Sequence, residues 1–258
     1  MNITQIRNAT VIVNWGQTRL LVDPMLAPKG RIPSLKYATR HRRRNPLVDL
    51  PVNATEHLNS VTHCLITHCQ KGHFDHLDRT ATRWLRDRQI PVICMEVDAD
   101  FLAKKGLSIQ VVLQADQTQP FLDGHITPIP CVHGYGWVGG LMAHGSGYVI
   151  DIPNEPKLYI AGDTVYTEAV ETCLSEHQPE VSVIPAGGAR FDLGGDIIMG
   201  IEDAIHFSRR ATGQVIANHL EALDHCPVSR NALQDAVNRH GVSALVSIPQ
   251  DGETLNMP

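Results

Sequence analysis

The spacing of apolar residues predicts that the chain begins with a sheet. Three short apolar runs, Ile3–Ile6, Thr10–Asn14 and Arg19–Val22, follow one another closely, and residues 15–17 (Trp-Gly-Gln) form a turn signal between the last two. Short runs joined by tight turns are typical of antiparallel strands. The pattern therefore predicts an antiparallel meander near the N-terminus.

Strands and helices alternate along the rest of the chain. Short apolar runs predict strands, whereas apolar residues at helical spacing among polar ones predict helices. Strands that come first in each half, with strand–helix alternation after them, predict two mixed β-sheets with helices outside, in the α+β class. We expect further strands at Val61–Ile66, Val92–Met95, Ser108–Leu113, Ile126–Val132, Tyr148–Ile152, Leu158–Ala161, Val181–Pro185, Val215–Ala217 and Ala244–Ile248, and helices at Leu77–Arg88, Thr167–His177, Ile201–Arg210 and Ser229–Arg239.

A basic, proline-rich stretch without periodicity is predicted to be an insertion at about residues 24–52. At this length it is too long for an ordinary loop and is typical of a lid or another functional segment. Its basic run at residues 40–44 includes Arg40, whose guanidinium is suited to bidentate contacts with a phosphate or carboxylate of a substrate. A solvated surface loop is the alternative for most of these arginines.

The composition is that of a folded, mildly acidic protein. The 258 residues carry 22 Lys and Arg against 27 Asp and Glu, a formal net charge of −5, which provides no basic field for nucleic acid or an anionic membrane. The length favours one large domain over residues 1–258. No apolar run reaches the roughly 18 residues of a membrane-spanning helix, and the first residues lack the pattern of a signal peptide. We therefore expect a cytoplasmic protein.

The six cysteines show neither metal-binding nor redox spacing. They are scattered, and no two of them form a C-x-x-C motif. In a chain of this length they are expected mainly as small buried residues. Cys69 and Cys131 lie beside histidines, so a role next to a functional site stays open for these two.

A dense group among the 14 histidines directly follows a predicted strand. Residues 68–78 contain three histidines and two aspartates beside them, namely His68, His73, Asp75, His76 and Asp78. Imidazole and carboxylate side chains at the end of a strand can converge on one cation. The sequence therefore predicts a metal site here, with a polar loop that carries incidental histidines as the alternative.

Three later strand ends offer the same chemistry. His133, Asp163 and His219 each stand where an apolar run ends. Taken one at a time, a hydrogen-bonded structural histidine or an aspartate in a turn accounts for each. Because loops at one edge of a sheet collect functional groups, four such strand ends in one chain favour a shared site.

Four motifs, in order along nearly the whole chain, resemble a known family. They are the opening Ile6–Val13 with Thr18–Pro24, the cluster His73-x-Asp75-His76-x-Asp78, the later Gly162-Asp163-Thr164, and Met199–Ala204 leading to Asn218-His219. With these motifs the chain resembles the metallo-β-lactamase-fold hydrolases, and within them the branch that includes L-ascorbate-6-phosphate lactonase and N-acylphosphatidylethanolamine phospholipase D. The resemblance implies a four-layer αββα sandwich of two mixed β-sheets with helices outside.

The same resemblance implies two divalent metal ions. Imidazole and carboxylate ligands suit Zn²⁺, with Mn²⁺ or Fe as alternatives. By the family's pattern, three histidines hold one ion, an aspartate and two histidines hold the other, and a further aspartate bridges them: His68, His73 and His133; Asp75, His76 and His219; and Asp163.

The chain departs from the family's H-x-H-x-D-H pattern at the first position. The slot two residues before His73 holds Lys71, and the candidate first histidine, His68, stands five residues before His73. Because His68 follows a predicted strand end, we expect a short bulge that lets it reach the metal. A mononuclear site, or Cys69 as a substitute ligand, is the alternative.

The resemblance also implies hydrolysis of a small molecule. Two cations roughly 3.5–4 Å apart lower the pKa of a bridging water, so that a hydroxide between them attacks the substrate. We expect an ester-like bond, in a lactone or a phosphodiester, and leave an anionic substrate and a homo-oligomer open. Alternatives are an RNA- or DNA-processing nuclease of the same fold, which the acidic charge disfavours, and a non-catalytic member with an altered metal site.

Further candidate residues accompany the ligands. Asp75 is a candidate catalytic residue as well as a ligand, and His225 is a candidate general acid for the leaving group. A supporting role next to the metals, or a place at a helix start, is the alternative for His225. His144 and Tyr135, which follow the predicted ligand His133 in a glycine-rich loop, are candidate substrate-binding residues together with Arg40.

Overall fold

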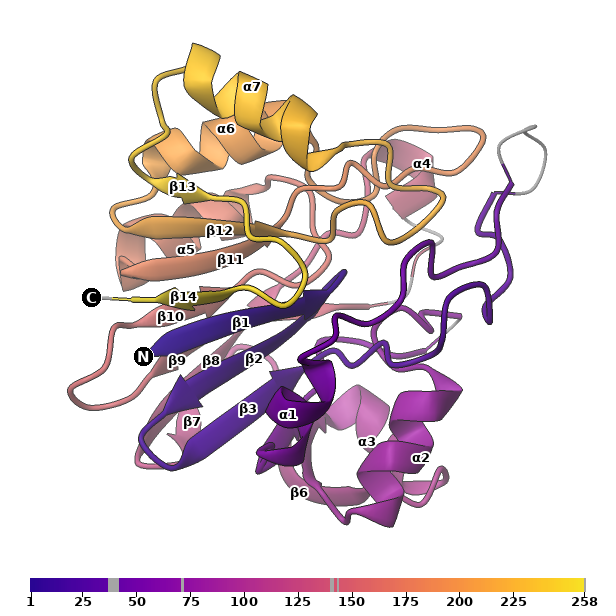
Figure 1. Cartoon of the computed structure of the whole chain (residues 1–258). Coiled ribbons are helices and arrows are strands. Elements are labelled where there is room, and N and C mark those ends of the chain that lie inside the picture. The colour runs from indigo at the N-terminus through magenta and orange to yellow at the C-terminus, as the bar shows by residue number, and fades with distance from the viewer. Residues whose placement is uncertain (37–41, 71, 140–141, 143, 258) are drawn as a thin grey trace.

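Two seven-stranded mixed sheets pack face to face and carry helices on their outer faces (Figure 1). The computed structural model describes residues 1–36, 42–70, 72–139, 142 and 144–257. Its four layers are the αββα sandwich of the α+β class that the sequence predicts. The prediction that residues 1–258 form a single domain stays a prediction.

The first sheet contains the N-terminal meander and the strands that follow it. Its order is β14-β1-β2-β3-β4-β5-β6, in which β14 to β3 are antiparallel and β3 to β6 are parallel. The C-terminal strand β14 pairs with β1, which brings the two ends of the chain together in one sheet (Figure 1). The strands are β1 Asn2–Arg7, β2 Thr10–Trp15, β3 Thr18–Val22, β4 His63–Leu65, β5 Pro91–Met95, β6 Ser108–Leu113 and β14 Thr254–Asn256.

The second sheet repeats this arrangement. Its order is β13-β12-β11-β10-β9-β8-β7, with an antiparallel meander from β7 to β10 and parallel pairs from β10 to β13. The two halves of the chain therefore share one order of strands. The strands are β7 Gln119–Phe121, β8 Gly124–Pro130, β9 Ser146–Asp151, β10 Leu158–Ile160, β11 Val181–Pro185, β12 Gln214–Asn218 and β13 Val246–Ser247.

Alternation along the strands separates the inner core from the outer ones. In β2, Val11 and Val13 face the second sheet, whereas Ile12 between them packs under the helices of the first sheet, because successive side chains in a strand point to opposite faces. Three helices cover the first sheet, three cover the second, and one short helix stands apart (Figure 1). They are α1 Ala54–Asn59, α2 Arg79–Asp87 and α3 Glu96–Ala103; α5 Glu168–His177, α6 Ile201–Arg210 and α7 Arg230–Arg239; and α4 Gly136–Gly139.

Several predicted boundaries are wrong by a few residues. Helix α2 begins at Arg79 and not at Leu77, because the Asp78 side chain accepts a hydrogen bond from the Ala81 amide and caps the helix. Strand β4 begins two residues later than predicted and ends at Leu65. The elements α1, α3, α4, β7 and β14 are not among those predicted from the sequence.

The predicted insertion is anchored to the sheet by a buried arginine. The Arg7 guanidinium donates to the carbonyls of Met25 at 2.5 Å, Ala27 at 2.9 Å and Val48 at 3.1 Å. The Arg7 side chain is fully buried. Burial lowers the pKa of this guanidinium to about 10, although nearby carboxylates, Asp78 first, oppose the shift. The ends of the insertion are therefore held firmly against β1.

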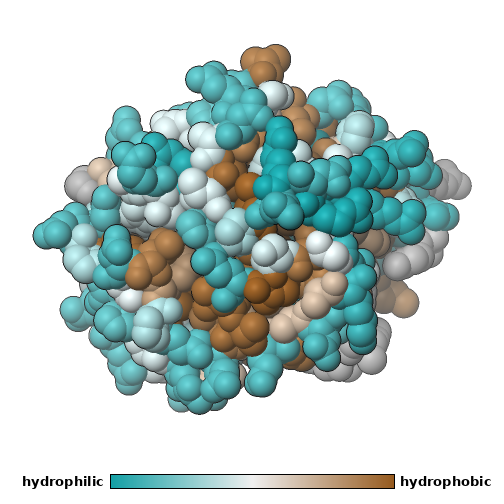
Figure 2. Space-filling view, turned by 90° about the horizontal axis from the view of Figure 1, so that it is seen from below, coloured by the Kyte–Doolittle hydropathy of each residue, from teal (hydrophilic) through white to brown (hydrophobic). Residues whose placement is uncertain are grey.

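The face of the molecule around α1 to α3 mixes hydrophilic and hydrophobic residues (Figure 2). Figure 2 shows the molecule from below, on the side of α1 to α3, where hydrophobic residues gather in the middle of a hydrophilic surround. Among the described residues, no helix is long and apolar enough to cross a membrane.

Candidate metal centre

The seven predicted metal ligands meet at one edge of the sandwich. His68 follows β4, and His133, Asp163 and His219 follow β8, β10 and β12. The remaining three, His73, Asp75 and His76, lie in the turn that leads into α2. Each sheet thus delivers part of the set, as expected because loops at one edge of a sheet collect functional groups.

Three of these residues form a compact group of imidazoles, which we call the histidine group: His68, His73 and His133. One ring nitrogen of each lies within 4.8 Å of those of the other two. The ring centroids of His68 are 4.4 Å from His73 and 5.4 Å from His133. His68 therefore reaches the position expected of a first ligand in spite of its unusual spacing from His73.

The other four residues form what we call the mixed group: Asp75, His76, Asp163 and His219. The Asp163 Oδ2 atom lies 3.1 Å from His76 Nε2 and 3.5 Å from His219 Nε2, and the Asp75 Oδ2 atom lies 3.5 Å from His219 Nε2. Asp163 Oδ2 also lies 3.6 Å from Nε2 of His133, in the histidine group. One carboxylate oxygen therefore stands between the two groups.

All five histidines turn the same nitrogen away from the centre. Each Nδ1 has a partner outside the two groups, which leaves Nε2 to point inward, and this outer bond fixes which nitrogen carries the proton. The partners of Nδ1 are Thr67 Oγ1 for His68 at 3.0 Å, the Gln70 carbonyl for His73 at 2.6 Å, Asp23 Oδ2 for His76 at 2.8 Å, the Ile197 carbonyl for His133 at 2.7 Å and Cys226 Sγ for His219 at 3.5 Å.

Two members of the histidine group, His68 and His133, favour the neutral imidazole. Burial lowers the pKa of His68 well below its ordinary value, and the neighbouring His76 and His73 lower it further. Burial likewise lowers the pKa of His133, to about 4, although Asp163 opposes the shift. A neutral imidazole keeps a lone pair on Nε2, which is the form that binds a metal.

The mixed group favours charged partners. Burial works against both charges, but the neighbouring acidic groups, Asp163 first, together outweigh it and raise the pKa values of His76 and His219. The same two histidines hold the pKa values of Asp75 and Asp163 below the ordinary range of a carboxyl group, against the effect of burial. A cation that binds here displaces protons from the histidines and keeps the favourable charge.

The donor set fits a divalent metal ion in each group. His68 Nε2 is buried and has no hydrogen-bond partner among the described residues, and a buried polar atom of this kind requires a partner. Imidazole nitrogens with carboxylate oxygens are the ligands of Zn²⁺, Mn²⁺ and Fe in proteins. The residues present are therefore able to hold two ions.

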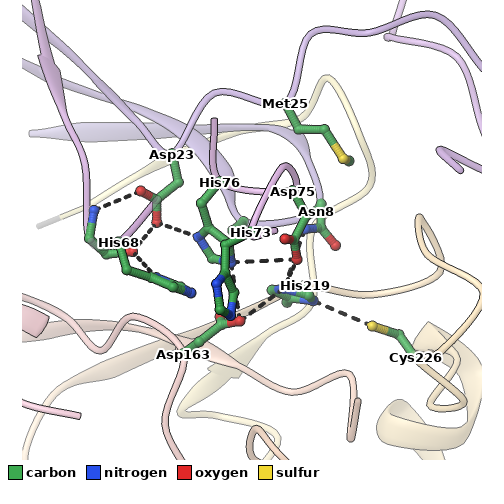
Figure 3. Close-up of polar contacts among 12 residues, drawn as sticks. Asn8, Asp23, Met25, His68, His73, Asp75, His76, Asp163, His219 and Cys226 are labelled. Atoms are coloured by element: carbon green, nitrogen blue, oxygen red, sulfur yellow. Dashed lines mark hydrogen bonds and ion pairs between the residues drawn. The ribbon is translucent and has the colours of Figure 1, made fainter. Parts of the chain in front are cut away.

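Asp23 supports ligands of both groups (Figure 3). Its Oδ2 atom accepts hydrogen bonds from His76 Nδ1 at 2.8 Å and from the Thr67 hydroxyl at 2.6 Å, and its Oδ1 atom accepts one from the Thr67 amide at 2.8 Å. The Thr67 oxygen in turn accepts from His68 Nδ1. One buried carboxylate thus orients His76 directly and His68 through a hydroxyl group.

Neighbours of His219 form a second supporting layer. The Cys226 thiol lies against its Nδ1, and the Asn8 amide nitrogen lies 3.3 Å from its Nε2 (Figure 3). Burial raises the pKa of the Cys226 thiol, but His225 and His219 outweigh it and lower the pKa to about 7. His225 is itself buried, and its ring stacks on Phe191 with centroids 6.2 Å apart.

Two of the predicted substrate-binding residues, Tyr135 and His144, make side-chain hydrogen bonds with residues outside the two ligand groups. The Tyr135 hydroxyl donates to Asp203 on α6 at 3.0 Å. His144 Nε2 lies 3.1 Å from Asp98 Oδ2 on α3. Arg40 lies outside the described residues.

Asp23, Thr67, Asp98 and Cys226 are not among the predicted site residues. Asp23 carries a usable signal, because it directly follows the apolar strand β3 as the predicted ligands follow theirs. Thr67 immediately precedes His68. Asp98 lies far along the chain from the histidines it supports, and no local pattern marks it. Cys226 lies seven residues after His219, but its spacing is not that of a metal-binding motif.

The fold and the clustered ligands define a metallo-β-lactamase-fold hydrolase. The model of the Beta-lactamase superfamily domain matches residues 18–219. The chain is 36% identical to the UPF0173 protein YddR of Bacillus subtilis over 257 residues, 98% of this chain and 99% of that one. It is 26% identical to a UPF0173 metal-dependent hydrolase of Koribacter versatilis over 192 residues, 72% of each chain. The chain therefore belongs to the UPF0173 metal-dependent hydrolase family.

A solved structure matches the whole chain. It is the crystal structure of isothiocyanate hydrolase from Delia radicum gut bacteria, which has a TM-score of 0.88, is 32% identical, and is matched over 100% of this chain and 99% of that one. The narrower resemblance to the branch of L-ascorbate-6-phosphate lactonase and N-acylphosphatidylethanolamine phospholipase D stays a prediction.

Proposed function

We propose that this protein is a binuclear metal-dependent hydrolase that adds water to the electrophilic carbon of a small, uncharged substrate. The observation that carries the proposal is the pair of adjoining groups with Asp163 Oδ2 between them, 3.1 Å from His76 and 3.6 Å from His133. Two cations held in this way lower the pKa of a water molecule enough to give hydroxide near neutral pH. We propose Zn²⁺ as the native metal, with Mn²⁺ or Fe as the alternatives.

The side chains beside the ligands favour an apolar substrate. Four partly buried residues pack against one buried apolar cluster, and we call these four residues the apolar collar: Leu35, Phe74, Met142 and Phe191. The cluster under the collar includes Ile197 and Cys226, the neighbours of His133 and His219. A polar reaction centre beside apolar side chains is typical of a pocket for small organic molecules.

We propose His225 as the group that donates a proton to the leaving group. It stacks on Phe191 of the apolar collar and lies close enough to Asp75 to feel its charge. Burial works against protonation, but the Cys226 thiol and Asp75 outweigh it and raise the pKa of His225. A histidine that holds its proton near neutral pH suits a general acid.

Isothiocyanates are the substrate class we propose first, because the chain matches an isothiocyanate hydrolase over its full length. The central carbon of R–N=C=S is electrophilic and uncharged. Water adds to this carbon, the nitrogen takes up a proton, and cleavage of the carbon–nitrogen bond releases a primary amine and carbonyl sulfide. The apolar collar is suited to the R group.

An ester-like bond is the second candidate. The attack of hydroxide on the carbonyl carbon of a lactone requires the same centre, and the four sequence motifs favour it. A phosphodiester needs cationic side chains that recognise phosphate, for which Arg40 and its neighbours are the candidates. We also propose a small-molecule partner and a cytoplasmic location.

The test is a substrate screen with protein that has been stripped of metal and reloaded with Zn²⁺. The protein is incubated with benzyl isothiocyanate, a γ-lactone and bis(p-nitrophenyl) phosphate, and amine, acid and nitrophenol are measured. We expect amine release that falls more than about a hundredfold in His76→Ala, which removes one ligand of the mixed group. Activity that survives in His76→Ala, or no bound metal in the unaltered protein, would contradict the proposal.

A further inference from the structure

The loop between the first two histidines needs support from outside itself. Four residues separate His68 from His73, where the family's pattern has one. The ring centroids of these two histidines are nevertheless only 4.4 Å apart. The loop must therefore fold back on itself, and its shape decides whether both rings face the same point.

A buried carboxylate on α3 accepts hydrogen bonds from side chains of this loop. The Asp98 side chain is fully buried, and its Oδ1 atom accepts hydrogen bonds from Gln70 Nε2 at 2.8 Å and from the Cys69 thiol at 3.5 Å. Gln70 Nε2 also donates to the Val97 carbonyl at 2.8 Å. The backbone carbonyl of Gln70 accepts the hydrogen bond from His73 Nδ1. The contacts that fix Gln70 therefore also orient a predicted ligand.

The other oxygen of the same carboxylate holds a second loop. Asp98 Oδ2 lies 3.1 Å from Nε2 of His144, in the loop that begins with His133. That loop returns along the first one: the Ser146 amide donates to the Thr67 carbonyl at 3.3 Å. Gly145 lies beside the His68 ring: a Cβ added at Gly145 would be in van der Waals contact with that ring, 3.8 Å from its Cγ.

We propose that Asp98 is a positioning residue that joins the two loops carrying all three members of the histidine group. Asp98 contacts neither group itself and acts through Gln70 and His144. Without it, the histidine group binds its metal weakly, while the mixed group, whose members hold one another by ion pairs, keeps its own. This inference rests on the proposed function, because it requires a metal in each group.

The test measures metal content and ligand field, not turnover. Protein is stripped of metal, reloaded with Co²⁺, and examined by elemental analysis, by chelator competition and by visible absorption, which reports the ligands around each ion. In Asp98→Ala we expect one of two ions to bind tenfold to a hundredfold more weakly, as for loss of other supporting contacts to metal ligands. We expect the absorption of the second ion to stay unchanged.

The conservative variant Asp98→Asn is expected to restore both ions. Its oxygen accepts from Gln70, and its amide donates to His144 Nε2 when the proton of that ring sits on Nδ1. The matched control is Asp100→Ala, which removes an exposed carboxylate from the same helix and should leave both ions in place. Gln70→Ala removes the shorter of the first loop's two hydrogen bonds to Asp98 and leaves the second loop's contact intact. It should weaken the same ion selectively.

The outcomes separate the two proposals. Absence of bound metal in the unaltered protein overturns both. Two ions in the unaltered protein, with equal affinity and absorption in Asp98→Ala, overturn only the role of Asp98. If Asp98→Ala does not fold, Gln70→Ala decides: selective loss of one ion supports the role, and two ions bound at full affinity overturn it.

Discussion

Replacement of Asp23 by asparagine changes a single atom and should weaken both metal sites or, in the opposite orientation of the amide, lower the stability of the fold beside them. In the native arrangement, Oδ2 receives protons from His76 Nδ1 at 2.8 Å and from the Thr67 hydroxyl at 2.6 Å, while Oδ1 receives one from the Thr67 amide at 2.8 Å. A carboxylate accepts at both oxygens, whereas an amide accepts at one and donates at the other. Asp23→Asn therefore places a donor against a donor in either orientation.

The size of the effect follows from the proton positions. If the amide nitrogen faces His76, Nδ1 of that ring must give up its proton, and the proton then sits on Nε2, where the metal would bind. The Thr67 hydroxyl must likewise turn toward His68 and impose the same exchange there. Loss of such an outer partner lowers metal affinity roughly tenfold to a hundredfold, or about 1.4–2.8 kcal/mol at each site. In the opposite orientation the buried Thr67 amide loses its acceptor, which costs about 1–3 kcal/mol.

The assay is chelator competition on metal-free protein titrated with Zn²⁺, with circular dichroism to establish that the variant folds. Thr67→Val serves as the comparison, because it removes only the hydroxyl between Asp23 and His68 and should weaken only the histidine group. Asp23→Asn that binds two ions with affinities within about threefold of the unaltered protein, and that also has an unchanged free energy of unfolding, would refute this reasoning. So would Thr67→Val that weakens both sites equally.

Three further predictions concern stability. Asp78→Ala removes the acceptor of the Ala81 amide at 2.7 Å and of the Ala27 amide at 2.6 Å, and should lower the free energy of unfolding in urea by about 2–4 kcal/mol; a loss below 0.5 kcal/mol would contradict this. Arg7→Met leaves three carbonyls of the insertion without their donor, so proteolysis at residues 24–52 should become faster while cleavage elsewhere does not. The pKa of His133 is lowered from 6.5 to about 4, so the unfolded chain binds a proton that the folded metal-free protein does not. Its free energy of unfolding should therefore fall by about 3 kcal/mol as the pH drops from 6.5 to 4, with a shallower fall in His133→Asn; equal slopes would contradict the prediction.

The layers of the fold could be predicted because the strands carry a period of two. Val11 and Val13 face one core and Ile12 the other, and this pattern is visible in the sequence. Strand β14 has no such signal, since it is three residues long and its pairing with β1 joins residues about 250 positions apart. Helix α3 has a weak apolar pattern and follows directly on β5, so nothing local marks its beginning.

The same contrast holds for the candidate site. The seven residues that meet there could be named from the sequence because each stands at a strand end or in one dense motif. Among their supports, Asp23 and Thr67 stand at predicted strand ends and could have been named. Asp98 meets the site only through tertiary packing, and Cys226, seven residues after His219, has no metal-binding spacing. Tyr135 shows the converse: a residue two positions after a predicted ligand is held elsewhere, by Asp203.

The division of the chain between the two sheets bears on how the protein is assembled. Apart from β14, the first sheet is built from residues before 114 and the second from residues after 118. The first part carries His68 and its neighbours in the turn before α2, and the second carries His133, Asp163 and His219. A chain cut in the short connection between β6 and β7 would therefore yield two fragments, each with an incomplete ligand set. Metal would favour their association, and β14 of the second fragment would pair with β1 of the first.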